Sequence, residues 1–352
     1  MPDRGVGGCE RAIVTEAKIS VILPYYNGAA FISGALASIL RQSVAPHEVM
    51  VINDGSTEEA SAALRTAIDM HSDALTIHLI EQENQGQSAS RNRGVDAATG
   101  DLMAFLDQDD EWRPEHLAHL SAPFESSPEL GWTYSDFDEI DGQGKIVTRQ
   151  FIRAHRSHHP KLSILEILGE DLMILPSASM LRKSAIEQVG GFDPRLRGYE
   201  DDDLFIRMFQ AGWTSRFLGE ALTRFRVHQG SSSDNSSFRN SRMVFFEKMS
   251  TEFPDDFRLN RLYISDLLVP RLLASTVSEY STALQLRQDA EVRRIAESIG
   301  ILLAGRHRVR LRSRLGVQVL RRPRLCRTIL RLSQSLPRFL RPSISPALLP
   351  WG

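Results

Sequence analysis

The sequence has little cysteine and no long apolar run. Its two cysteines, Cys9 and Cys326, are far apart and form no spaced pattern, so neither a disulfide framework nor a zinc site is expected. No stretch reaches about 18 consecutive apolar residues, the length that spans a membrane, and Met1–Lys18 has no apolar core of the kind a secretory signal needs. These absences predict a cytoplasmic protein in a reducing compartment.

Acidic residues are missing from the C-terminal region. From Ser298 to Gly352 there are twelve arginines, no lysine and no aspartate or glutamate. The other 297 residues hold the remaining 30 basic residues and all 44 acidic ones, a formal −14 beside +12. This asymmetry predicts an anionic partner for the C-terminal region.

Apolar runs alternate with helical patterns in the first 110 residues. Near-continuous apolar strands between helices are typical of a parallel sheet that is covered on both faces. The sequence therefore predicts an α/β fold. The expected strands are 19–23, 48–52, about 75–80 and about 102–106, and the expected helices are about 30–42, 58–70 and 87–98.

Polar turns follow three of these strands. They are Pro24–Asn27, Asn53–Ser56 and Asp107–Asp109. Ligands gather at the carboxyl ends of parallel strands in folds of this kind. The three turns are therefore expected to meet at one edge of the sheet.

Aspartates are crowded directly after the apolar run 102–105. Buried unpaired like charges carry a large desolvation penalty, so they persist when a cation compensates them. Asp107 and Asp109 stand two residues apart, and Mg²⁺ or Mn²⁺ favours carboxylate oxygens together with substrate phosphates. We expect a metal ion and a diphosphate here; the alternative is a solvated acidic turn.

The later part of the chain is less regular. Strands are expected at 131–135, 145–147, 178–181 and 223–227, with helices at 202–211 and 241–303. The predicted organisation is a flexible lead-in over 1–17, an α/β domain over 18–235 and a mainly helical region over 236–352 with an Arg-rich tail at 306–341. Alternating arginines predict a strand between Arg306 and Val319, and the spacing after Pro323 predicts an amphipathic helix that ends at Pro337.

Several motifs occur in a fixed order along the chain. They are Ser20–Asn27, Asn53–Ser56, Asn84–Gly94, Phe105–Asp110, Gly190–Asp193, Gly198–Leu204 and Arg226–Ser231. Together they resemble the family-two inverting glycosyltransferases with the GT-A fold, of the type that builds bacterial surface polysaccharides. The resemblance covers about residues 18–235. One position departs from it, since Asn53 stands where the family usually has an aspartate.

The resemblance implies a role for each motif. It implies that Asp54 recognises the base, that Arg91 faces the donor, and that Asp201, with Glu200 as second candidate, is the general base. The implied donor-binding residues are Pro24, Tyr26, Asn27, Asp54, Gly55, Ser56, Asn84, Gly86, Arg91 and Asp107. The implied metal ligands are Asp107, Asp109 and His228.

Simpler structural roles are open for the same residues. Asp54–Gly55 is also a good turn dipeptide, Tyr26 could belong to a core, and Arg91 could form a surface salt bridge. His228 could be structural. Acidic residues at the start of a helix, such as Asp202 and Asp203, can cap it and complement its dipole.

The resemblance implies a metal-dependent transfer of one sugar, a hexose or an N-acetylhexosamine, from a nucleotide-sugar, with a UDP-sugar as the first choice. The acceptor is expected to be a hydroxyl of a glycan or a lipid-linked glycan, because the chain lacks the Gln-x-x-Arg-Trp motif of processive synthases. Alternatives are a nucleotidyltransferase, although no Gly-rich basic loop follows the first strand, and a non-catalytic nucleotide-sugar-binding scaffold.

The Arg-rich tail suits an anionic membrane surface, which would place the enzyme on the inner face of the cell membrane. Pairing of its arginines with the acidic body of the chain is the alternative. Nucleic acid is not an expected partner, because aromatic residues are nearly absent among these arginines.

Overall fold

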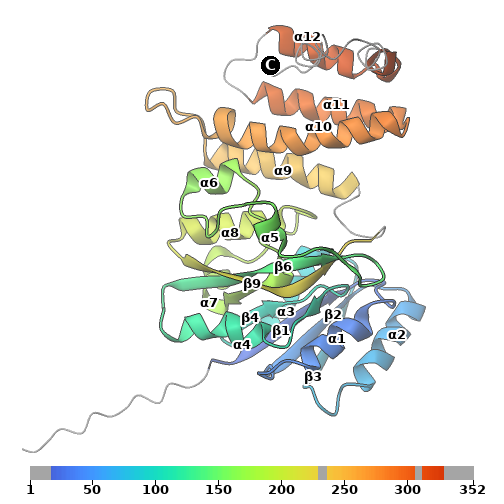
Figure 1. Cartoon of the computed structure of the whole chain (residues 1–352), viewed down its shortest axis with the longest axis vertical. Coiled ribbons are helices and arrows are strands. Elements are labelled where there is room, and N and C mark those ends of the chain that lie inside the picture. The colour runs from blue at the N-terminus through green and yellow to red at the C-terminus, as the bar shows by residue number, and fades with distance from the viewer. Residues whose placement is uncertain (1–16, 229–235, 306–310, 329–352) are drawn as a thin grey trace, which may run out of the picture. The chain divides into compact units, whose positions relative to one another are not determined.

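The computed structural model describes residues 17–228, 236–305 and 311–328 (Figure 1). By their contacts these residues divide into two units. The first unit takes in the described residues up to His155, together with Pro176–Gly191 and Gly212–Arg226. The second consists of Arg156–Leu175, Phe192–Ala211 and the described residues from Val227 onward. The predicted lead-in lies almost wholly outside the described residues, and the predicted domain boundary at 235 stays a prediction.

The first unit is built around one nine-stranded sheet with the order β3-β2-β1-β4-β8-β6-β9-β5 and β7 paired to β6. The half made of β3, β2, β1 and β4 is parallel, as the sequence predicts. In the other half β8 is antiparallel to both of its neighbours, and β6 runs parallel to β9. The strands are β1 Ile19–Tyr25, β2 Glu48–Asp54, β3 Ile77–Gln82, β4 Leu102–Phe105, β5 Glu111–Trp112, β6 Leu130–Ile140, β7 Ile146–Thr148, β8 Ser179–Arg182 and β9 Thr214–Arg226.

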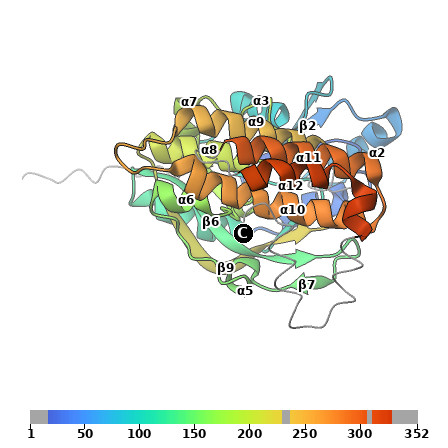
Figure 2. The ribbon, with the colours of Figure 1, turned by 90° about the horizontal axis from the view of Figure 1, so that it is seen from above.

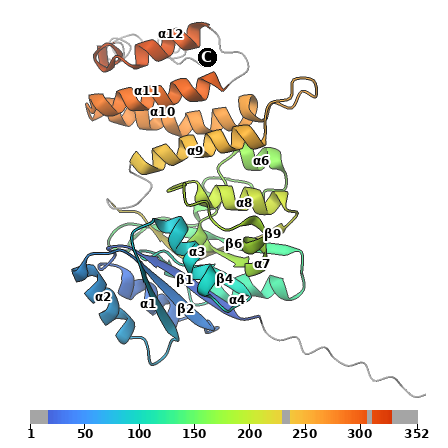
Figure 3. The same cartoon turned by 180° about the vertical axis from the view of Figure 1, so that it is seen from behind.

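Helices cover both faces of the parallel half. Alternate residues of β1, such as Val21 and Leu23, are fully buried in one cluster with α1 and α2, as expected for side chains that alternate across a strand. On the other face α3 lies so close to the sheet that a Cβ added at Gly94 would stand 2.5 Å from Ile22 Cγ2 (Figure 3). The helices of this unit are α1 Ile32–Leu40, α2 Glu58–Asp69, α3 Gln87–Ala97, α4 His116–Ser121, α5 Phe151–Ala154 and α7 Lys183–Val189.

The second unit is helical. Within it α10 and α11 lie side by side and α12 lies against α11 (Figure 2). Its elements are α6 Ile164–Gly169, α8 Glu200–Gln210, α9 Ser236–Glu252, the π-helix η4 Tyr263–Leu268, α10 Val269–Gln285, α11 Asp289–Ala304 and α12 Leu311–Leu320. Among the described residues, no helix combines the length and the apolar character that a membrane crossing needs.

The strand predicted between Arg306 and Val319 is wrong. Residues 311–320 form the helix α12, and 306–310 lie outside the described residues. Val317 and Leu320, three residues apart, are both buried, so a helical repeat places the apolar residues better than the period of two that the arginines suggested. The helix predicted after Pro323 is confirmed over 323–328; the rest of that prediction lies outside the described residues.

Candidate active site

The three polar turns predicted to converge do lie at the ends of adjacent strands, because β2, β1 and β4 are neighbours in the sheet. The first two turns are joined by two hydrogen bonds of Asn27, one from its backbone and one from its side chain. Its backbone amide donates to Ser56 Oγ over 3.0 Å, and its side-chain Oδ1 accepts from the Thr57 amide over 2.9 Å. Tyr26 beside it is 49% exposed, so it is not a core residue, and its contact with a donor stays a prediction.

Gln108, in the middle of the acidic turn, joins that turn to the end of β1. Its side chain accepts from the Tyr26 amide over 2.8 Å and donates to the Tyr26 carbonyl over 3.1 Å. A Cβ at Gly28 would stand only 2.2 Å from Gln108 Oε1, so a larger residue there would displace this side chain. Two hydrogen bonds from one amide therefore fix the spacing between the aromatic residue and the two candidate metal ligands.

Asp54 has a firm structural role. Its carboxylate accepts hydrogen bonds from Gln82 Nε2 over 2.7 Å and from the amides of Gln85 and Gly86, each over 2.8 Å, while its carbonyl accepts from Asn84 Nδ2 over 3.0 Å. These bonds pin the start of α3 to the end of β2. The neighbouring Gly55 has a φ of +69°, which an L side chain rarely adopts, as expected for the turn dipeptide. Base recognition by Asp54 stays a prediction.

Arg91 is buried and does not lie open toward a donor. Its guanidinium Nη2 stands 2.8 and 3.2 Å from the two carboxylate oxygens of Asp107, and the residue is only 1% exposed. The salt bridge foreseen as the simpler role of Arg91 is thus present, but it is internal. Because Asp107 is also held through its amide by Ser177 Oγ over 3.0 Å, Arg91 fixes the position of a candidate metal ligand.

Arg226, at the end of β9, binds the acidic turn from the other side. Its amide donates to Asp110 Oδ1 over 2.9 Å, its Nε to the Asp109 carbonyl over 2.8 Å, and its Nη2 to Glu111 Oε1 over 2.7 Å. Its guanidinium also lies over the Phe31 ring, 5.2 Å from the centroid. One arginine thus bonds to three consecutive acidic residues, and its guanidinium pairs with the carboxylate of Glu111.

The pKa of Asp110 is affected by the other charges in this turn. Burial raises the pKa of Asp110 well above its usual value, and the charges of Asp109 and Asp107 raise it further, while hydrogen bonds from Ser177 and the Arg226 backbone oppose the rise. The carboxylates of Asp107 and Asp109 thus disfavour the charged form of Asp110. A divalent cation bound at this turn would oppose that repulsion.

The residues of the turn fit Mg²⁺ or Mn²⁺. Asp107 is 30% exposed in its side chain and Asp109 is half-buried, whereas Asp110 is buried and turned to Arg226. Across the described residues, no three His, Cys, Asp or Glu side chains are grouped so that they could hold a metal ion, and the role of His228 as a ligand stays a prediction. Mg²⁺ is commonly held by one or two carboxylates with phosphate oxygens completing the shell, which is what this turn offers.

In the second unit, four acidic residues begin α8, and two of them are tied to cations. Asp202 is bound by Arg271, which also donates to the Ile167 carbonyl over 3.1 Å. Burial raises the pKa of Asp202 to about 6, and the charge of Arg271 opposes that rise. Asp203 pairs with Arg207 at 2.7 Å and Lys248 at 2.5 Å. These two carboxylates therefore support the helix rather than a substrate.

Asp201 and Glu200 precede them. Asp201 is half-buried, and its Oδ1 accepts from the Asp202 amide over 2.8 Å, while Glu200 is 4% exposed. Exposure thus favours Asp201 over Glu200 as the carboxylate that can meet an acceptor. His228, which belongs to the same unit, is half-buried.

The sequence did not predict the arginines that contact the N-terminal end of α8. Arg242 of α9 is 1% exposed, donates to the Tyr199 hydroxyl and Thr276 Oγ1, each over 3.0 Å, and pairs with Glu279. Tyr199, the residue before α8, has a φ of 63°. The pattern of 241–303 indicated only helices, and the spacing of residues in a helix does not distinguish buried arginines from exposed ones.

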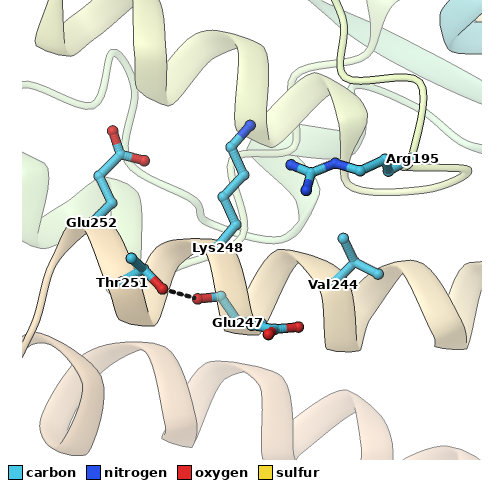
Figure 4. Close-up of a pocket in the computed structure, with 6 residues that line it drawn as sticks. All are labelled: Arg195, Val244, Glu247, Lys248, Thr251 and Glu252. Carbon is cyan, nitrogen blue, oxygen red and sulfur yellow. Dashed lines mark hydrogen bonds between the residues drawn. The ribbon is translucent and has the colours of Figure 1, made fainter.

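A surface hollow of about 500 Å³ lies on the second unit (Figure 4). Both of its cations are already bound to Asp193, Arg195 at 2.7 Å and Lys248 at 3.1 Å. None of its lining residues belongs to the motifs that are expected to bind the donor. The hollow is lined by Arg195, Val244, Glu247, Lys248, Thr251 and Glu252.

The contacts of Arg226 predict a large effect of its removal. Arg226→Ala should lower the free energy of unfolding by about 3–5 kcal/mol, because a buried cation is lost that pairs with Glu111 and donates to the Asp109 and Asp141 carbonyls. Arg226→Lys should keep most of the stability but weaken Mn²⁺-dependent donor binding, since an ammonium cannot reproduce the planar fork. Thermal unfolding and Mn²⁺ titration of both variants measure this; a lysine variant with wild-type Mn²⁺ affinity would contradict it.

Comparison with known proteins gives a consistent picture. The model of the family "Glycosyl transferase family 2" matches residues 20–190. An uncharacterized glycosyltransferase of Nostoc sp. is 28% identical over 253 residues, which cover 72% of this chain and 76% of that protein. The amylovoran biosynthesis glycosyltransferase AmsB of Erwinia amylovora is 26% identical over 245 residues, with 63% and 76% covered.

Solved structures share the fold. TarS 1–349 of S. aureus in complex with UDP-GlcNAc is 17% identical with a TM-score of 0.59, and 88% of each chain is covered. The mannosyltransferase PcManGT of Pyrobaculum calidifontis, in complex with GDP-Man and Mn²⁺, is 18% identical with a TM-score of 0.52, covering 83% of this chain and 86% of that one. The GT-A-like fold expected from the motifs is confirmed.

Proposed function

We propose that this chain, whose residues 20–190 match glycosyl transferase family 2 and whose relatives include named glycosyltransferases, is itself a glycosyltransferase. The proposed enzyme transfers a single sugar from a UDP-sugar, with inversion, to a hydroxyl of a glycan or lipid-linked glycan. The proposed enzyme depends on Mg²⁺ or Mn²⁺. The observation that carries the proposal is the rigid acidic turn Asp107–Asp109 beside the exposed ring of Tyr26, at the shared edge of three parallel strands.

The donor assignment draws on this geometry and on the relatives. An exposed aromatic ring next to the Asn53–Ser56 turn suits a nucleoside, and the acidic turn suits a metal-bound diphosphate. UDP-GlcNAc is bound by TarS, and Mn²⁺ accompanies GDP-Man in PcManGT. We therefore assign donor binding to the residues named from the motifs, with Arg91 acting through Asp107.

The proposed reaction is a single displacement. A divalent cation bound at Asp107 and Asp109 would neutralise charge on the departing diphosphate. The Asp201 carboxylate accepts the proton of the acceptor hydroxyl as its oxygen forms a bond to the anomeric carbon, while the bond to the diphosphate oxygen breaks. A base of this kind typically contributes ~10²–10⁴-fold to the rate.

The acceptor class follows from the relatives' names and the sequence. O-antigen and amylovoran biosynthesis proteins are among the similar chains, and the chain lacks the motif of processive synthases. The nucleotidyltransferase alternative is disfavoured because the turn after β1 is closed by the Gln108 and Asn27 side chains rather than opened as a Gly-rich phosphate loop. A non-catalytic scaffold is disfavoured because it would not need the carboxylates of Asp107 and Asp109 at this turn.

A panel of donors tests the proposal. Purified protein is incubated with UDP-, GDP- and dTDP-sugars, with and without Mn²⁺ or Mg²⁺, and released nucleoside diphosphate is measured. We expect slow release from one or more UDP-sugars that is abolished by EDTA. Release of pyrophosphate would favour the nucleotidyltransferase, and binding without any release would favour the scaffold.

A further inference from the structure

One end of the helical second unit presents exposed arginines and leucines together. We call this surface the basic end and define it by Leu286, Arg287, Arg321, Arg322, Arg324 and Leu325. Leu286 is 63% and Leu325 is 40% exposed, and the four arginines are exposed as well. Large exposed apolar side chains among cations are typical of a surface that meets another phase or molecule.

Contacts bring the two groups of this set together, although Leu286 and Arg321 are 35 positions apart in the sequence. The Tyr280 hydroxyl, near the end of α10, donates to the Leu320 carbonyl over 2.8 Å and lies 3.3 Å from Cys326 Sγ. Arg327 pairs with Asp289, the first residue of α11, at 2.7 Å. The segment 320–327 therefore crosses the turn between α10 and α11, which carries Leu286 and Arg287.

The charge of the basic end is uncompensated within the described residues. Asp289 is already bound by Arg327, and Glu291 of α11 is bound by Arg239 and Arg294. Across the same residues, none of the four guanidinium groups at the basic end forms an ion pair. The chain that continues beyond Thr328 adds Arg331, Arg338 and Arg341 and no acidic residue, so it extends the positive charge.

We propose that the basic end docks the enzyme on an anionic lipid bilayer, with Leu286 and Leu325 entering the headgroup region and the arginines contacting lipid phosphates. Guanidinium groups match phosphate oxygens in pairs, and leucines add apolar area that a soluble polyanion would not bury. A nucleic acid is the poorer occupant, because no aromatic side chain is available in this set to stack on bases.

Liposome binding tests the proposal. The full chain is sedimented with vesicles of pure phosphatidylcholine and of phosphatidylcholine with 30% phosphatidylglycerol, at ~50 and ~500 mM salt. We expect binding to the anionic vesicles only, weakened at high salt. Each basic residue near an anionic surface contributes about fivefold, so the triple variant Arg321→Glu, Arg322→Glu, Arg324→Glu should lose about 100-fold in partition coefficient.

A matched variant separates this surface from general charge. Arg41→Glu, Arg149→Glu and Arg258→Glu change three exposed arginines elsewhere and alter the net charge equally, and this variant should bind as wild type does. Leu286→Ser with Leu325→Ser should weaken binding even at low salt.

Equal loss in both charge variants, no binding by the wild type, or displacement from vesicles by an equimolar RNA oligonucleotide would overturn the proposal. Donor hydrolysis by all variants is expected to stay at the wild-type rate, so membrane docking and the proposed function fail independently.

Discussion

The enzyme with Asp109 replaced, Asp109→Asn, is expected to lose at least about 10²-fold in metal-dependent turnover while its fold is retained. The physical reason is that the cation stabilises the charge of the leaving diphosphate by several kcal/mol, and each 1.36 kcal/mol corresponds to a tenfold change in rate. The fold should persist, because Asp109 contributes its backbone carbonyl to Arg226 and asparagine keeps that carbonyl. Turnover is measured as released nucleoside diphosphate over a range of Mn²⁺ concentrations.

The control for this experiment is Asp96→Asn, the same chemical change at an exposed position of α3. This variant should turn over donor at the wild-type rate. Wild-type activity of Asp109→Asn, or undiminished activity of the unaltered enzyme in EDTA, would contradict a role of the metal ion in turnover. Loss of activity in both variants would indicate a fold defect, which thermal unfolding detects.

The second large effect is expected at the base. Asp201→Asn should lower kcat for transfer to an acceptor by about 10²-fold or more and leave donor affinity close to that of the wild type, because the amide cannot take the hydroxyl proton. The amide oxygen can still accept from the Asp202 amide, as Oδ1 does in the structure, so the helix start should remain intact. Acceptor assays under donor saturation and nucleotide titration separate the two quantities.

The neighbouring residue supplies a matched control. Asp202→Asn leaves the buried cation of Arg271 without its carboxylate and is expected to lower the free energy of unfolding by about 3–5 kcal/mol. Asp201→Asn should unfold at the wild-type temperature. If donor affinity collapses in Asp201→Asn while kcat is little changed, the base is another residue, and Glu200 is the next candidate.

The parallel half of the sheet was predictable because three of its four strands, β1, β2 and β4, are buried at every residue. Continuous apolar runs such as Ile19–Leu23 leave few other assignments. The convergence of the polar turns followed from the rule on strand carboxyl ends, and the contacts of Asn27 and Gln108 confirm that convergence. β9 was harder: only its end was expected, since residues 214–222 are mostly half-exposed or exposed and lack an apolar run.

The partners within the site could not be read from the sequence. Arg91 and Asp107 are 16 positions apart, and Arg226 lies 116 positions from Asp110. A motif shows that such residues are near a ligand but not whether they touch it or hold a neighbour. The α12 region failed for a different reason, because alternate arginines mimic the period of a strand while the burial of Val317 and Leu320 follows a helix.

The most direct test of the central claim is an anomalous-scattering measurement on crystals of the protein grown with Mn²⁺ and UDP. The account predicts one manganese peak within coordination distance of the Asp109 carboxylate, with the UDP diphosphate bound to the same ion and the uridine beside Tyr26. The account also predicts that this peak is absent from crystals of Asp109→Asn. A manganese ion away from the Asp107–Asp109 turn, or UDP bound in an ordered pose with no metal, would contradict the account.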